Sequence, residues 1–375
     1  MKTIMIVAGE SSGELYGSLL ARALKKRWPD IRLIGLGGER MRDEGVQLIS
    51  GLSHSFGLIE VLSSLKTLRD AINKAKRAID DQRPSVCVLI DFPDFNFRLG
   101  FYAKKKGIKV LYYVSPQVWA WRKGRVKKIK EIADRIALIL PFEEEIYRAL
   151  GIEAEFVGHP ALEEIMDKSV EHRQDACAPN NRPTIALLPG SRPNELRRHL
   201  PVFNDLVDMI KKDFEGCSII LPFAQNLNLS LFERELMSLE DKGVEIIRGD
   251  AIRVFQLADA AVIASGTATL QAALMGVPMV VIYKLSLLTY LLGRLILKVR
   301  YISIVNILSG KGVVPELIQE KARPELIMEE LKRLLRDSNY RDNMIKDLNN
   351  LKCLFSGKNP SLRVTEMIGE MAGWL

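Results

Sequence analysis

Two carboxylates stand three residues apart directly after an apolar run. They are Asp91 and Asp94 in the segment IDFPDFNFR, where Pro93 stops a strand from continuing because it lacks a backbone N–H. Neighbouring phenylalanines would leave a carboxylate poorly solvated, which raises its pKa and makes it a usable general base. The simpler alternative is that Asp94 caps a helix over residues 95–105. Because a cap needs only one acid, the pair favours acid–base chemistry.

Two later segments, LLPGSRPNELRRHL and ASGTATLQAALMGVP, place glycine and hydroxyl residues where an apolar run gives way to a helical pattern. A helix N-terminus has unsatisfied N–H donors and a partial positive charge, and an arginine adds a bidentate fork, so each segment can hold a phosphate. The alternatives are an ordinary capped helix start for the first and close helix–sheet packing for the second. Two such helix starts could converge on one diphosphate. The residues concerned are Gly190, Ser191 and Arg192 in the first segment and Ser265, Gly266, Thr267 and Gln271 in the second.

A third segment, VAGESSGELYG, carries Glu10 at the tip of a predicted strand-to-helix turn. It matches neither the dinucleotide fingerprint nor the P-loop. It is therefore either a tight turn that needs glycine or a loop whose N–H groups and Glu10 face a polar ligand. The four histidines show no Ser/His/Asp order and no metal-ligand spacing, and only His159, in FVGHP, follows a predicted strand near a domain boundary. We expect no metal and no cofactor.

Short β-rich runs alternate with amphipathic helical segments through most of the chain, which is typical of parallel sheets with crossover helices. A polar segment, EHRQDACAPNNRP, interrupts the alternation and has the composition of a linker. We therefore predict an α/β protein with two Rossmann-like, doubly wound domains facing across a cleft. The domains are residues 1–165 and 184–357, joined by a linker over 166–183, and whether a C-terminal helix near 358–375 packs back on the first domain is left open. The predicted strands are Thr3–Ala8, Arg32–Gly35, Val86–Ile90, Lys109–Val114, Arg135–Leu140, Glu155–Val157, Thr184–Leu188, Ser218–Leu221, Val244–Ile247, Ala261–Ile263 and Met279–Ile282.

Length and charge narrow the class of protein. At 375 residues the chain exceeds the limit of about 250–300 residues for one hydrophobic core. A formal charge of +8 favours a negatively charged partner. Four separated cysteines without a C-x-x-C pair indicate reduced thiols in the cytosol. The first apolar run is too short for a signal peptide, and the uncharged run Ala260–Tyr283 is divided by Gly276 and Pro278, so we expect no transmembrane helix.

Two segments instead favour contact with an anionic bilayer. In YYVSPQVWAWRKGRVKKIK the aromatic residues precede the basic ones, whereas interleaving would suit nucleic acid better. In Leu285–Tyr301 leucines recur at helical spacing, with Arg294 and Lys298 along the border of the stripe. A buried core helix is the alternative for these leucines. We expect peripheral membrane binding and no nucleic-acid partner.

Together these segments resemble the lipid A disaccharide synthase family, glycosyltransferases of the two-Rossmann-domain GT-B type. The resemblance covers nearly the whole chain and follows the family's order, although any single motif would be weak. The matching motifs are AGESSGELYG, GLGGERM, FGLIEVL, IDFPDFNFRL, YYVSPQVWAWRKGRVKKI, LPFE, FVGHP, LLPGSRPNE, ASGTATLQAALMGVPMVV and YISIVNIL.

The resemblance implies a metal-independent, inverting hexosyl transfer in lipopolysaccharide biosynthesis of Gram-negative bacteria. UDP-2,3-diacylglucosamine and 2,3-diacylglucosamine 1-phosphate (lipid X) would give the β-1,6-linked lipid A disaccharide 1-phosphate and UDP. Asp94 would be the base, supported by Asp91 and Glu10, with the choice between the two aspartates left open, and Arg192 would hold the leaving diphosphate. The implied UDP-binding residues are Gly190, Ser191, Arg192, Ser265, Gly266, Thr267, Gln271 and Asn306. The implied acceptor or lipid contacts are Phe56, Leu58, Val61, Leu62, Ser115 and Trp119, of which the first four also suit a core helix.

One departure from the family affects the donor site. Gln271 stands where relatives usually carry Glu, so a hydrogen bond to a ribose hydroxyl would be uncharged and weaker. The competing hypotheses are another UDP-sugar enzyme of this architecture, such as an epimerase or a peptidoglycan-precursor transferase, and an inactive nucleotide-sugar or lipid-binding protein. The expected location is the cytoplasmic face of the inner membrane. The sequence leaves open whether the chain forms a homodimer.

Overall fold

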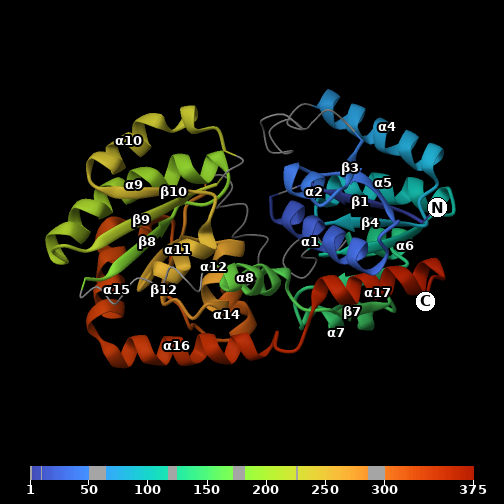
Figure 1. Cartoon of the computed structure of the whole chain (residues 1–375). Coiled ribbons are helices and arrows are strands. Elements are labelled where there is room, and N and C mark those ends of the chain that lie inside the picture. Colours follow the sequence, from blue (N-terminus) through green and yellow to red (C-terminus); the bar gives the residue numbers. More distant parts are fainter. Residues whose placement is uncertain are drawn as a thin grey trace. The chain divides into compact units, whose positions relative to one another are not determined.

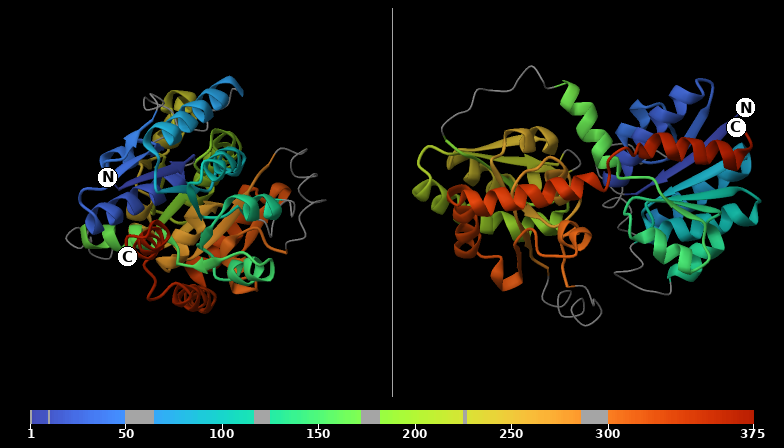
Figure 2. Two further views of the ribbon diagram at one scale, coloured as in Figure 1. Left: turned by 90° about the vertical axis from the view of Figure 1, so that its right-hand side faces the viewer. Right: turned by 90° about the horizontal axis from the view of Figure 1, so that it is seen from below.

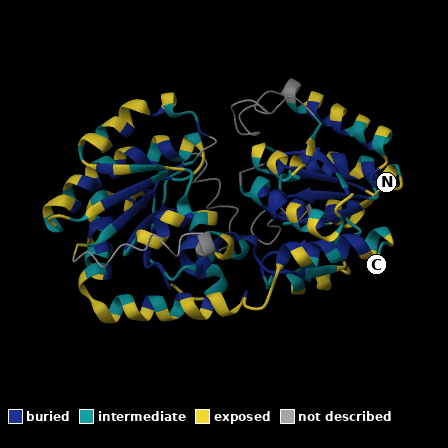
Figure 3. Cartoon of the chain, in the orientation of Figure 1, coloured by how far each residue is buried: buried dark blue, intermediate teal, exposed yellow. Residues whose placement is uncertain are grey.

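The computed structural model divides the chain into two compact α/β units (Figure 1). The first unit contains Met1–Pro160 together with Gly357–Leu375, and the second contains Ala161–Ser356. In each unit the strands are largely buried, and the helices around them carry the exposed residues (Figure 3). The structure describes residues 2–9, 11–49, 65–116, 125–171, 182–224, 227–285 and 300–375.

The described strands of the first unit form one parallel sheet in the order β3-β2-β1-β4-β5-β6-β7. Every residue of β1 and β4 is buried, as expected for central strands with helices on both faces. The prediction lacked only β3, because two residues carry no alternation pattern. The bounds are β1 (Thr3–Ala8), β2 (Arg32–Leu36), β3 (Gln47–Leu48), β4 (Val86–Ile90), β5 (Lys109–Tyr113), β6 (Arg135–Leu138) and β7 (Ala154–Phe156).

The described strands of the second unit also form a parallel sheet, in the order β10-β9-β8-β11-β12-β13. This is the doubly wound order 3-2-1-4-5-6. The three-residue β13, at the edge of the sheet, was not predicted. The bounds are β8 (Thr184–Leu188), β9 (Ser218–Phe223), β10 (Val244–Arg248), β11 (Ala260–Ala264), β12 (Met279–Tyr283) and β13 (Glu316–Ile318).

Helices cover both faces of each sheet. In the first unit, α4, α5 and α6 share a buried cluster with alternate strand residues such as Met5 and Leu89, while α1 and α17 pack together and α17 lies against β4 and β5. In the second unit, α9 packs with α10 and α15, and α12 packs with α11, α14 and α16. The first unit's helices are α1 (Ser11–Arg27), α2 (Glu39–Asp43), α4 (Leu65–Gln82), α5 (Pro93–Lys105), α6 (Arg125–Ile132), α7 (Glu143–Ala149) and α17 (Pro360–Ala372). The second unit's are α8 (Pro160–Glu171), α9 (Pro193–Asp213), α10 (Glu233–Asp241), α11 (Ala251–Leu257), α12 (Thr267–Leu274), α14 (Ile304–Ser309), α15 (Pro324–Arg336) and α16 (Ser338–Cys353), with 3-10 turns η1 (Leu229–Leu231) and η2 (Gln319–Lys321).

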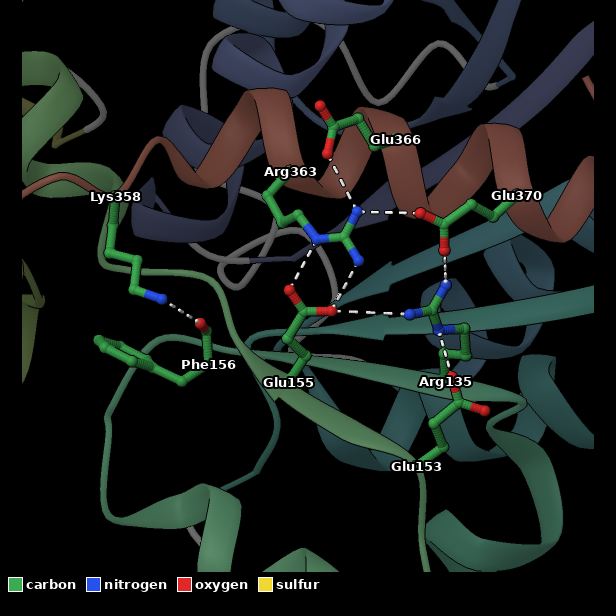
Figure 4. Close-up of polar contacts among 8 residues, drawn as sticks. All are labelled: Arg135, Glu153, Glu155, Phe156, Lys358, Arg363, Glu366 and Glu370. Atoms are coloured by element: carbon green, nitrogen blue, oxygen red, sulfur yellow. Dashed lines mark hydrogen bonds and ion pairs between the residues drawn. The ribbon is translucent and has the colours of Figure 1, made fainter. Parts of the chain in front are cut away.

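The C-terminal helix α17 belongs to the first unit, which answers the question left open by the sequence (Figure 2). Arg363 on α17 binds Glu155 of β7 through two parallel contacts, Nε to Oε1 at 2.6 Å and Nη2 to Oε2 at 2.9 Å. Arg135 pairs with Glu370 on α17 and, at 2.7 Å, with Glu153 (Figure 4). Such a bidentate, shared network ties the last helix to strands β6 and β7.

The predicted fold class, α/β with two Rossmann-like doubly wound domains, is confirmed. The observed division falls after Pro160 rather than after residue 165. Helix α8 continues to Glu171, six residues into the predicted linker. Residues 172–181 lie outside the described part of the chain.

Candidate active site

Each sheet reverses its strand order at one place, and the predicted site residues follow the strands on either side of that place. In the first sheet the reversal lies between β1 and β4, and in the second between β8 and β11. At such a switch point the helices leave toward opposite faces, which opens a crevice beyond the carboxyl ends of the strands. The segments that leave these four strands are Gly9 onward, Asp91–Asp94, Pro189–Arg192 and Ser265–Thr267.

The backbone after β4 is strained. Asp91 and Phe92 both adopt left-handed conformations, with φ of 46° and 45°. The carbonyl oxygen of Asp91 accepts hydrogen bonds from Asn96 Nδ2 at 2.7 Å and from the Tyr112 hydroxyl at 2.9 Å. At the end of the neighbouring strand β5, Val114 has φ of 60°, which is rare for a β-branched residue. Strain held in place by such bonds is common where a protein positions a functional side chain.

Asp94 stands in the first turn of α5 and is exposed. The residue at the cap position is Phe92, so the alternative that Asp94 caps the helix is wrong. One of the two carboxylates was expected to be poorly solvated beside the phenylalanines, and Asp94 is not that one, because it is exposed. Phe95 and Phe97 are buried in the core beneath α5, on the side of the helix away from solvent. Asp91 is partly exposed.

The loop after β8 is held by its own helix. Gly190 has φ of 107°, and the carboxylate of Glu195 accepts hydrogen bonds from the N–H groups of Ser191 at 3.1 Å and Arg192 at 3.3 Å. The Arg192 guanidinium also pairs with Glu195, at 3.4 Å, and its side chain is 53% exposed. The two backbone donors that were predicted to bind phosphate therefore already serve a carboxylate, and Arg192 is left as this loop's contribution to an anion site.

The loop after β11 is open by comparison. Gly266 stands at the cap of α12 in an extended conformation, and no side chain caps the helix. A Cβ built at Gly266 meets no described atom within 4 Å, and both Gly266 and Thr267 are exposed. Thr269 is buried and donates its hydroxyl to the Gly266 carbonyl at 2.6 Å, while Ser265 donates its N–H to Ile282. The N-terminal end of α12 is thus the more accessible place for a phosphate.

The amide of Asn306, which was predicted to bind the nucleotide-sugar, is hydrogen-bonded within the chain. It is 1% exposed, and its Oδ1 accepts the N–H groups of Val313 at 2.7 Å and Val314 at 2.9 Å. Its Nδ2 donates to the Val314 carbonyl at 2.9 Å and to Glu316 Oε1 at 2.7 Å. All four hydrogen-bonding positions of the amide are occupied within the chain. Asn306 therefore fixes the turn before β13 and has nothing left for a nucleotide-sugar.

Two other predicted contacts are buried. Gln271 is 8% exposed, and its Nε2 donates to Glu164 on α8 at 2.7 Å. Ser115 is 5% exposed and lies beside Tyr147, so the described structure leaves it no contact with a lipid chain. The predictions that lie outside the described residues are Glu10, Phe56, Leu58, Val61, Leu62, Trp119 and residues 286–299 of the leucine-rich segment.

His159 is a buried, neutral side chain. Its ring lies edge-on to that of Tyr16 on α1, with centroids 5.7 Å apart. Burial lowers the pKa of His159 to about 3. At neutral pH the imidazole is uncharged, and its position suits packing between α1 and the end of β7.

Three glutamates hold predicted site residues in place, and the sequence analysis gave none of them this role. Glu195 holds the loop after β8, Glu164 holds Gln271, and Glu316 holds Asn306 and the N–H groups of Ile302 and Ser303. Glu195, three residues after Arg192, fits the spacing of a capping box and could have been found. Glu164 and Gln271 are 107 positions apart in the sequence, and no local pattern predicts a pair at such a separation.

The comparisons with known proteins agree with this geometry. A family model described as lipid-A-disaccharide synthetase matches residues 4–360. A lipid-A-disaccharide synthase from Syntrophus aciditrophicus is 41% identical over 361 residues, 94% of this chain and 93% of the relative. Among solved structures, MnaA from S. aureus with UDP has a TM-score of 0.71 at 12% identity, covering 100% of this chain and 98% of that chain. UDP-GlcNAc 2-epimerase from Neisseria meningitidis bound to UDP-GlcNAc has a TM-score of 0.68 at 12% identity, covering 99% and 100%. At such identities these two structures show the fold alone.

Proposed function

Because this chain belongs to the lipid-A-disaccharide synthetase family, we propose that its two sheets supply the two halves of one glycosyl transfer. The enzyme transfers diacylglucosamine from UDP-2,3-diacylglucosamine to the 6-hydroxyl of 2,3-diacylglucosamine 1-phosphate. The products are the β-1,6-linked disaccharide 1-phosphate and UDP. The first unit presents the base to the acceptor, and the second unit binds the UDP part of the donor.

In the first unit, Asp94 accepts the proton of the acceptor's 6-hydroxyl. The hydroxyl oxygen attacks the anomeric carbon of the donor from the face opposite the diphosphate, the bond from that carbon to the diphosphate oxygen breaks, and the configuration inverts. An exposed carboxylate is reachable by the acceptor, and the arriving sugar and acyl chains remove its water. Asp91 keeps a supporting role, since its strained backbone fixes where α5 begins.

In the second unit, the leaving diphosphate is stabilised at the N-terminal end of α12. The open N–H groups around Gly266 and Thr267 and the exposed Arg192 offer donors and positive charge to it. Gln271, about one turn into α12, contacts the nucleoside. These groups act most strongly on the charge that develops as UDP departs, so they accelerate the chemical step as well as binding.

The observation that carries this proposal is the placement of both residue sets at the switch points of their sheets. Asp94, Arg192 and Gly266 are exposed and accessible to substrates, whereas His159, Asn306 and Ser115 are buried. The family match at 41% identity favours the transferase over the epimerase hypothesis, because the epimerase structures are similar only in fold.

Both substrates are lipids, and a basic surface on the first unit suits an anionic membrane. This surface is formed by exposed basic residues of α5 and α6, and the two helices contain only two acids, Asp94 and Glu131. The helices are neighbours, since Lys128 Nζ on α6 lies 5.9 Å from the ring centroid of Phe97 on α5. Phe101, 40% exposed, adds an apolar contact. None of the helices in the described ranges is long and apolar enough to cross a bilayer. The basic face consists of Arg98 and Lys105 on α5 and Lys127, Lys128 and Lys130 on α6.

A product assay tests the proposed function. The purified chain is incubated with UDP-2,3-diacylglucosamine and lipid X, and disaccharide 1-phosphate and UDP are measured separately. Equal amounts of both products are expected. UDP-N-acetylglucosamine, which carries no long acyl chain, serves as the control donor. Epimerisation of this compound, together with no disaccharide from the diacylated substrates, would reject the transferase.

A further inference from the structure

Gln271 and Glu164 form a buried pair that joins α12 to α8 within the second unit. Both residues are 8% exposed, and Gln271 Nε2 donates to Glu164 Oε2 at 2.7 Å. A hydrogen bond to an ionised acceptor is roughly twice as strong as one between neutral groups. The bond also fixes which end of the amide faces which side, because only the nitrogen of an amide can donate.

The carboxylate of Glu164 also lies near a lysine of its own helix. Lys168, one turn later on α8, places its Nζ 3.8 Å from Glu164 and 2.9 Å from Asp250. Asp250 in turn accepts the N–H of Arg253 at the start of α11, at 3.1 Å. A buried carboxylate without partners would be costly, and here the Gln271 amide donates a hydrogen bond while the Lys168 ammonium lies within ion-pair distance. Glu164 is therefore a fixed anchor that links α8 to α12 and, through Lys168 and Asp250, to α11.

The bond to Glu164 fixes the direction in which the carbonyl oxygen of Gln271 can accept a hydrogen bond. With the amide nitrogen turned toward Glu164, the carbonyl oxygen Oε1 faces another direction, and no hydrogen bond to Oε1 is found among the described residues. Gln271 lies on the same short helix as Gly266 and Thr267, the residues that open its N-terminal end. The donors of a uridine nucleotide are the uracil N3–H and the ribose hydroxyls, and the ribose is the part joined directly to the diphosphate. A diphosphate at the N-terminal end of α12 would therefore bring the ribose hydroxyls closest to an acceptor on the same helix.

We infer that Glu164 is a positioning residue for nucleotide-sugar binding: it holds the Gln271 amide so that Oε1 accepts a hydrogen bond from the ribose hydroxyls of UDP. This inference rests on the proposed function. Two side chains share the task of recognising the ribose: Gln271 makes the contact, and the carboxylate of Glu164 orients the Gln271 amide. A change at either residue therefore alters ribose recognition, and exchanging the two residues restores it.

Calorimetry with two ligands tests the inference. The probes are UDP and 2′,3′-dideoxy-UDP, which lacks the ribose hydroxyls. Wild type should bind UDP more tightly than the dideoxy compound. In Glu164→Gln the acceptor of the Gln271 amide becomes a neutral carbonyl oxygen, which holds the amide less strongly. UDP affinity should then fall roughly 3- to 10-fold while dideoxy-UDP affinity stays unchanged. A merely structural role would weaken both ligands equally, and that result would overturn the inference.

The exchange of the two residues is the second arm. Gln271→Glu alone sets two buried carboxylates side by side and should weaken UDP binding, whereas the double variant Glu164→Gln/Gln271→Glu should return to within about 3-fold of wild type. Additive losses in the double variant would overturn the inference. If Gln271→Glu does not fold, Gln271→Ala replaces it, and Glu164→Gln should then have no further effect on UDP affinity. Failure of wild type to bind UDP would instead reject the proposed function.

Discussion

The ring of Phe92 occupies the space in which a side chain at Gly9 would stand. A Cβ built on Gly9 would lie 2.3 Å from Cγ of Phe92, closer than any real contact allows. This contact joins the segment that leaves β1 to the strained segment that leaves β4, the two sides of the first switch point. Gly9 is thus required by close approach and not by its backbone conformation, since its φ is not among the left-handed ones.

We expect Gly9→Ala to displace Phe92 and with it the start of α5. Overpacking of this kind costs about 1–3 kcal/mol of unfolding free energy. Turnover should fall at least tenfold as Asp94 moves, whereas UDP affinity, a property of the second unit, should stay unchanged. Gly13→Ala is the matched control, because its Cβ would make an ordinary contact of 3.5 Å with Ile90. Normal turnover in Gly9→Ala would show that the Phe92 contact does not position the base.

Gly266→Ala tests where the diphosphate binds. The position is open and extended, so an added methyl should change the free energy of unfolding by no more than about 0.5 kcal/mol. A diphosphate resting against the N-terminal end of α12 would meet that methyl, and UDP affinity measured by calorimetry should drop at least fivefold. If the loop after β8 is the true site, Gly266→Ala would bind UDP like wild type and Arg192→Ala alone would weaken binding.

Most of the fold follows from short-range patterns. The apolar runs predicted every described strand except β3 and β13, because a central parallel strand buries both of its faces and reads as an unbroken apolar segment. The positions of the candidate loops followed from the same pattern, since every one of them comes directly after such a strand.

The chemical roles were harder to predict because long-range partners decide them. Asn306 looks like a polar group at a site, yet Glu316 and two backbone N–H groups use it completely. Asp94 looks surrounded by aromatic residues, yet Phe95 and Phe97 are buried in the core while Asp94 is exposed. Neither outcome can be read from neighbours in sequence, since both depend on which side of a helix faces the sheet.

The basic face on α5 and α6 should bind anionic vesicles. Lys127→Glu/Lys128→Glu should lower co-sedimentation with phosphatidylglycerol vesicles roughly tenfold or more, at about 1 kcal/mol for each lysine near the surface. Binding to phosphatidylcholine vesicles should remain weak in both proteins. The control Lys346→Glu/Lys352→Glu changes the net charge equally on α16. If both variants lose binding to the same extent, net charge rather than this face attracts the lipid.

Acid should destabilise the first unit through His159. Its pKa is near 3 in the folded chain against 6.5 as the ordinary value, so the unfolded chain binds the proton first. The contribution of neutral His159 is present in full above pH 6.5 and is lost as the pH falls toward 3, by at most about 1.4 kcal/mol per pH unit. The free energy of unfolding of His159→Gln, measured between pH 7.5 and 5.5, should fall less steeply than that of wild type. Parallel curves would mean that His159 does not drive the acid sensitivity.

Asp94→Asn tests the central claim most directly, since it keeps the shape of the side chain and removes only its ability to take a proton. Disaccharide 1-phosphate formation and UDP affinity are measured on the same preparation, with Asp91→Asn alongside. We predict that Asp94→Asn folds, binds UDP like wild type and loses at least 100-fold in kcat. Asp94→Asn with near-normal kcat, or Asp91→Asn with the larger loss, would contradict the assignment of Asp94 as the base.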